Sequence, residues 1–67
     1  MFDKNKFKYY VSDRNETLGK VAEYLGINQA TLTRKLNGES DFYRAEIQAV
    51  ASMLHLSHDE VTEIFLA

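Results

Sequence analysis

Two short amphipathic segments separated by only three residues constrain the fold of this chain more than any other feature of its sequence. The first segment, 18–25, has apolar residues at the i, i+3, i+4 and i+7 spacing of one helix face: Leu18, Val21, Ala22 and Leu25. Gly26 suits the left-handed conformation in which a helix commonly ends, and Asn28 can cap a second helix over 29–36. A turn this short forces the two helices to cross steeply, as in a helix-turn-helix.

The second of these helices has one apolar face and one polar face. Leu32 and Leu36 lie four residues apart and are expected in the core, and Ile27 and Leu32 have the spacing of a hydrophobic staple around the cap. The opposite face carries short or hydrogen-bonding side chains that suit a DNA major groove: Gln29, Ala30, Thr33 and Arg34. Thr17 is the expected N-cap of the first helix.

Three further helical patterns surround this unit, and no alternating run is long enough to predict a strand. They cover about 3–12, about 43–54 and 57 to the end of the chain. Asp41 is the expected cap of the middle one, and Ser57 with Glu60 has the spacing of a capping box. The predicted fold class is therefore all-α: a single helix-turn-helix domain, residues 1–67, built as a small orthogonal bundle of about five helices.

Size and composition exclude several classes of function. With 67 residues, 45% of them apolar, the chain has material for one compact core and lacks room for a large catalytic cleft as well. It contains no cysteine, which excludes disulfides and thiolate metal ligands. No apolar run approaches the roughly 20 residues of a membrane span, and the first residues lack the apolar stretch of a signal peptide. We therefore expect a cytoplasmic protein that is not an enzyme and that uses no cofactor.

The two histidines are a poor metal site. His55 and His58 lie three residues apart, a spacing that allows metal binding on a continuous helix. The helix start expected at Ser57 lies between them and breaks that geometry. No metal site is predicted, and His58 is expected to be an exposed residue in the first turn of its helix.

The distribution of charge is more informative than its sum. The net charge of −2 argues against a nucleic-acid partner, but all eight basic residues fall in positions 1–44. From Ala45 onward there are four acidic residues and no lysine or arginine. This pattern is consistent with a DNA-binding half joined to an acidic half. Lys4, Lys6 and Lys8 are expected on a solvated face.

The stretch from Thr17 to Phe65 resembles the phage repressor and Cro type of helix-turn-helix domain, the lambda-repressor-like family, in the short form found in phages and prophages of Gram-positive bacteria. The resemblance is carried by Val21–Asn28 and Thr31–Gly38, and it continues through Asp41-Phe42, Glu46-Ile47, Leu54–Ser57 and Ile64-Phe65. It implies a protein without an enzymatic activity that binds double-stranded operator DNA through the helix at 29–36.

The resemblance implies a role for each matching position. Asn28 caps the recognition helix and contacts a phosphate, while Gln29 and Ala30 face bases, Gln pairing with adenine and Ala packing on a thymine methyl. Arg34 reaches a guanine edge or a phosphate. The remaining contacts position the protein on the DNA backbone: Thr17, Lys20, Thr31, Thr33, Lys35 and Asn37.

Some positions depart from the family pattern. The family often has a polar residue, commonly glutamine, near Leu18 or Gly19, where it contacts phosphate. Lys35 stands where many relatives have an apolar residue. Glu39 and Asp41 add negative charge to a loop that often lies near the DNA backbone. These departures predict a modest affinity for DNA.

Two groups of apolar residues have structural interpretations beside their functional ones. Six aromatic residues could stack on single-stranded nucleic acid but mostly occupy helix-packing positions, so a place in the core is the preferred interpretation: Tyr9, Tyr10, Tyr24, Phe42, Tyr43 and Phe65. The apolar residues at the C-terminal end pack either on the core or on a second subunit of a homodimer, and the two alternatives are equally open: Val61, Ile64, Phe65 and Leu66.

The sequence therefore favours sequence-specific binding of double-stranded DNA, as in a small phage-type transcriptional repressor that acts by occupying its operator. A homodimer formed on DNA is the expected bound species. The alternative is a protein-interaction module derived from a helix-turn-helix, such as an antirepressor or a regulator-binding protein. The net charge of −2 and the acidic second half favour that alternative.

Overall fold

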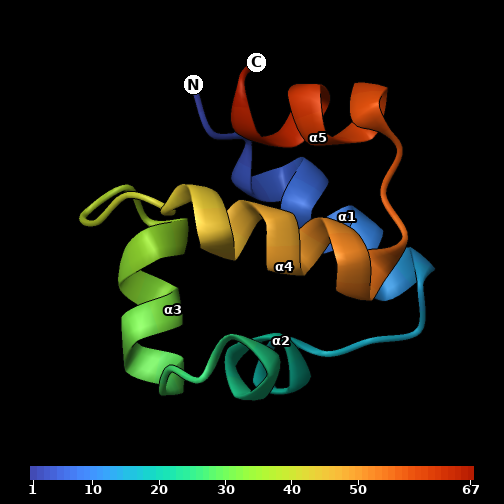
Figure 1. Ribbon diagram of the computed structural model, residues 1–67. Coiled ribbons are helices and arrows are strands. Elements are labelled where there is room, and N and C mark those ends of the chain that lie inside the picture. Colours follow the sequence, from blue (N-terminus) through green and yellow to red (C-terminus); the bar gives the residue numbers. More distant parts are fainter.

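The computed structural model describes residues 1–67 as five α-helices without a strand, which confirms the predicted fold class. The helices are α1 (Lys4–Asp13), α2 (Leu18–Leu25), α3 (Gln29–Leu36), α4 (Arg44–Leu54) and α5 (His58–Phe65). As Figure 1 shows, α4 runs through the middle of the bundle, with α2 below it and α5 above it. The first helix begins and ends one residue later than predicted, and α2 and α3 have the predicted bounds. None of these helices is long and apolar enough to cross a membrane.

Local capping interactions begin and end the helices where the sequence predicts. The Thr17 hydroxyl accepts a hydrogen bond from the Lys20 amide at 3.1 Å, and Asn28 Oδ1 accepts one from the Thr31 amide at 2.8 Å. Ser57 and Glu60 form the expected reciprocal capping box. Gly26 ends α2 in the left-handed conformation at φ 72°, which glycine adopts without the steric cost that a Cβ brings.

The N-cap of α4 differs from the predicted one. Tyr43, not Asp41, is the N-cap residue, and the Glu46 carboxylate accepts a hydrogen bond from the Tyr43 amide at 2.8 Å. The backbone carbonyl of Asp41 instead accepts a hydrogen bond from the Lys35 ammonium. Glu46, three residues into the helix, can reach back because this is the geometry of the second half of a capping box.

The core lies between α1, α2, α4 and α5 and is closed on one side by α3. Its ten buried apolar residues are Phe7, Val11, Val21, Ala22, Leu32, Leu36, Val50, Leu54, Ile64 and Phe65. The rings of Phe2, Phe7, Phe42 and Phe65 form one cluster, with centroids 5.0 to 6.3 Å apart. A cluster of this kind ties the N-terminal segment and the α3–α4 loop to the end of α5.

The aromatic residues divide between core and surface. Phe65 is buried, and Phe42 and Tyr10 pack partly buried against the core, as predicted. The prediction is wrong for Tyr9, Tyr24 and Tyr43, each more than half exposed. These three side chains project from outward positions of their elements, so helical spacing alone did not separate them from core residues.

The apolar C-terminal end packs on the core. Ile64 has no exposed surface and Phe65 is 8% exposed, while Val61 is half-buried against the same cluster. Of the four apolar residues at this end, Leu66 alone is largely exposed, at 70%. Of the two alternatives left open for this end, the structure shows packing on the core for Ile64 and Phe65, which help to fill the interior of so small a domain.

An arginine joins three helices on the side of the bundle away from α3. The Arg14 guanidinium donates to the Leu54 carbonyl at 3.1 Å and to both carboxylate oxygens of Glu60 at 3.0 and 3.1 Å. It also pairs with Asp13 and stacks over the Tyr10 ring at 5.0 Å. The hydrogen bonds to Glu60 and then to Asp13 raise the pKa of Arg14, and hydrogen bonds from Ser57 and then from Arg14 lower the pKa of Glu60. The contacts of Arg14 link the end of α1, the end of α4 and the start of α5.

Candidate nucleic-acid interface

The helices α2 and α3 form a helix-turn-helix at one edge of the molecule. Figure 1 shows α3 standing at this edge and crossing the directions of α2 and α4 steeply. Leu32 and Leu36 point into the core with 2% and 6% exposure, and Val21 and Ala22 bury the facing side of α2. Burial of these faces leaves the polar side of α3 as an exposed ridge.

All but one of the residues predicted for DNA contact lie along α3, at its ends or at the start of α2, with side chains that are at least partly exposed. Those at the start of α3 and along its outer side are exposed, and so are those at the start of α2: Thr17, Lys20, Asn28, Gln29, Ala30, Thr33, Arg34 and Asn37. Thr31 is half-buried. The first turns of the two helices adjoin, since the Gln29 amide lies against Gly19 of α2. We call the surface formed by these residues and Thr31 the α2–α3 face.

Lys35 is the exception. Its side chain is almost fully buried, and its ammonium lies 3.0 Å from Glu46 Oε1 and 2.8 Å from the Asp41 carbonyl oxygen. The Tyr43 ring covers the ammonium at 4.5 Å. A group held by these partners is not free to contact a phosphate, so the predicted DNA contact is not supported and Lys35 is left out of the α2–α3 face.

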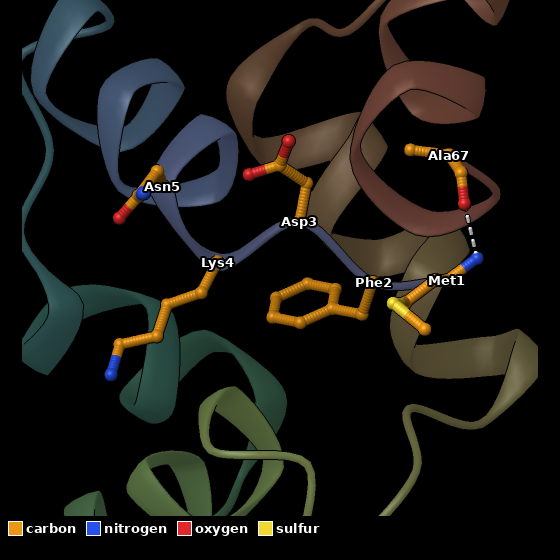
Figure 2. Close-up of a pocket in the computed structure, with 6 residues that line it drawn as sticks. All are labelled: Met1, Phe2, Asp3, Lys4, Asn5 and Ala67. Carbon is orange, nitrogen blue, oxygen red and sulfur yellow. Dashed lines mark hydrogen bonds between the residues drawn. The ribbon is translucent and has the colours of Figure 1, made fainter.

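The fold brings Lys4, which the sequence predicts on a solvated face, close to the α2–α3 face. The Lys4 ammonium donates a hydrogen bond to Asn37 Oδ1 at 2.9 Å, although the two residues lie 33 positions apart. Figure 2 shows the Lys4 side chain extending from the start of α1 toward the α2 and α3 region. No local pattern predicts this proximity, because it depends on where the fold places the start of α1 relative to the end of α3.

Three cations without an ion pair lie on or beside the α2–α3 face. Lys4, Lys20 and Arg34 form no ion pair, and the Arg34 guanidinium contacts only the neutral Thr31 hydroxyl, at 3.3 Å. Lys6 and Arg14, by contrast, pair with the acidic side chains of α5, Glu63 and Glu60. The acidic second half of the chain therefore pairs with Lys6, Arg14 and Lys35, and Lys4, Lys20 and Arg34 remain without an acidic partner at this edge.

The structure offers little else that resembles a binding site. A shallow depression is lined by the residues at the two chain ends: Met1, Phe2, Asp3, Lys4, Asn5 and Ala67 (Figure 2). Within it the Met1 amino group donates a hydrogen bond to the Ala67 carbonyl oxygen. No group of three His, Cys, Asp or Glu side chains is arranged to hold a metal ion.

The bundle and its exposed α3 thus define a small helix-turn-helix domain. The sequence profile of the BetR domain matches residues 7–64, and the chain belongs to this family of small helical domains of phage-type regulators. No individual curated protein and no solved structure gives a significant match to the chain. The family match spans all five helices and places the chain among regulatory domains.

Proposed function

We propose that this domain binds double-stranded DNA by inserting α3 into the major groove, and that it acts as a small phage-type repressor by occupying its operator. The observation that carries the proposal is the α2–α3 face, where an exposed helix with groove-compatible side chains is flanked by cations that have no acidic partner. Membership of the BetR domain family supports a regulatory role.

We expect different exposed side chains of α3 to contact different groups along the groove. Gln29 and Ala30 lie in its first turn, where a glutamine amide can pair with adenine and a methyl group can pack on thymine. Arg34, one helical turn further on, can reach a guanine edge or a phosphate. We expect Lys20 and Thr17 at the start of α2, and Lys4 beside Asn37, to contact phosphates.

A protein-interaction module remains the second candidate function, because the net charge is −2 and the acidic residues of α4 and α5 reduce attraction to DNA. A salt titration on generic duplex DNA separates the two proposals. A DNA-binding domain shows an affinity that falls linearly on logarithmic axes, with a slope near −0.9 per phosphate contacted. Absence of salt-dependent binding at low ionic strength would refute the DNA proposal and favour a protein partner.

Operator recognition by one copy would read only a few base pairs, so we further propose that two copies bind an inverted repeat with half-sites about 10 bp apart. Because Ile64 and Phe65 are buried in the core, the contact between copies does not use them. Selection of bound duplexes in vitro followed by measurement of stoichiometry tests this point. A 1:1 complex on a selected asymmetric site would show that one copy suffices.

A further inference from the structure

We propose that Gly19 is a positioning residue, which directs the Gln29 side chain and through it sets the base preference of the α2–α3 face. This inference rests on the proposed DNA-binding function and names a determinant of its specificity. It concerns the one place where the first turns of α2 and α3 meet.

Gly19 is not required by the backbone. The glycines with positive φ are Gly26 and Gly38, whereas Gly19 lies in the first turn of α2 with helical backbone. Glycine is a poor residue at such a position, because it leaves more conformational freedom to lose on folding than alanine does. A reason for a glycine here must therefore be sought in the space that its missing side chain leaves.

That space is occupied by the amide of Gln29. A Cβ built on Gly19 would lie 3.2 Å from Gln29 Nε2 and 3.9 Å from Gln29 Cδ, closer than an unstrained contact of this kind. The next nearest atom is the Thr17 hydroxyl oxygen, at 3.9 Å. The Gln29 side chain is thus folded back against α2, although it stands in an exposed position at the start of α3.

This arrangement affects which orientations of the Gln29 amide are available for pairing with a base. A glutamine reads adenine through two hydrogen bonds, one donated and one accepted, so the direction of its amide plane decides whether both can form. A flexible side chain supported on one side by α2 enters the groove with fewer orientations available. Adding a methyl group at Gly19 would displace the amide from its support while leaving the backbone of both helices in place.

The test is a double-mutant comparison of base preference, made by binding to duplexes that differ at one base pair. We expect Gly19→Ala to lower the preference at a single position by roughly threefold to tenfold, within the range set by one bidentate contact. In a Gln29→Ala background, the same Gly19→Ala change should leave the preference unaltered. An equal shift in both backgrounds, or no shift in either, would overturn the inference.

Two controls separate this effect from others. Lys20→Ala changes the neighbouring residue and should shallow the salt slope by about one without changing base preference. Gly19→Ala should retain or raise the melting temperature, since alanine favours helix, so that a lost preference does not reflect unfolding.

A measurement on the free protein tests the geometry independently of DNA. In the parent chain, nuclear Overhauser effects should connect the Gln29 side-chain amide protons with the Gly19 α-protons, and their absence would overturn the inference. If these contacts are present but the parent shows no salt-dependent DNA binding, the proposed function fails and the base-preference role fails with it. If DNA binds and the preference does not respond to Gly19→Ala, the inference alone fails.

Discussion

Removing Glu46 should expose how much the burial of Lys35 depends on its counter-ion. The Lys35 side chain is 3% exposed and that of Glu46 is 15% exposed, with 3.0 Å between the ammonium and Oε1. Glu46→Ala leaves the ammonium with one carbonyl oxygen and the Tyr43 ring as its partners. Breaking a fully buried pair by removing one partner costs about 3–5 kcal/mol.

The expected loss lies near the lower end of that range, because Glu46 retains some access to water and the Asp41 carbonyl oxygen still accepts from Lys35. The same substitution removes the hydrogen bond from the Tyr43 amide, a capping interaction worth about 1 kcal/mol. Together the two losses predict that Glu46→Ala destabilises the domain by about 4 kcal/mol. In a domain of this size, each 1 kcal/mol lowers the melting temperature by roughly 4–8 °C.

Chemical denaturation followed by circular dichroism measures the effect, and Lys35→Met is the matched control. Methionine fills similar volume without a charge, and the Glu46 carboxylate that remains is less buried than Lys35 and still accepts the hydrogen bond from the Tyr43 amide. Lys35→Met should therefore cost clearly less than Glu46→Ala, and Glu46→Ala should cost less in the Lys35→Met background than alone. If Lys35→Met proves the more damaging change, or if the two losses simply add, the reasoning about an uncompensated buried charge is refuted.

Three further predictions follow from the core, the exposed ridge and the arginine contacts. Leu32→Ala should cost about 2–5 kcal/mol in thermal or chemical unfolding, because Leu32 is 2% exposed and the change leaves a cavity; parental stability would contradict its burial. Arg34→Ala should retain the stability of the parent but lose about 1–3 kcal/mol of specific DNA binding if Arg34 reads a guanine; unchanged operator affinity would remove it from base recognition. The folded-state pKa of Glu60 lies below its ordinary value of 4.5, so its stabilising contribution is present above that value and is lost as pH falls through the lower, folded-state pKa. Glu60→Gln should accordingly weaken the dependence of stability on pH in that acidic range, and an unaltered acid-unfolding profile would count against the Arg14 contact as a source of stability.

Local sequence determined the helices and most of the candidate interface. The caps at Thr17, Asn28 and Ser57 act over three residues, and the αL end at Gly26 depends on one residue. These interactions are decided within one turn of chain, so their positions could be predicted without knowledge of the fold. The outward face of α3 could be predicted for a related reason. Leu32 and Leu36, one helical turn apart, define the buried side, so the polar positions between them face outward.

Tertiary packing alone decided the features that the sequence pattern assigned wrongly or left open. The sequence pattern predicts Lys35 as an exposed cation. It is buried because the α3–α4 loop brings Glu46 and the Asp41 carbonyl close to it, and these two groups stabilise its charge. Lys4 reaches Asn37 because the fold brings the start of α1 near the end of α3. Phe65 fills the core instead of an intersubunit patch. In each case the outcome depends on groups distant along the chain or on the volume left between helices, and periodicity within one helix contains no information about either.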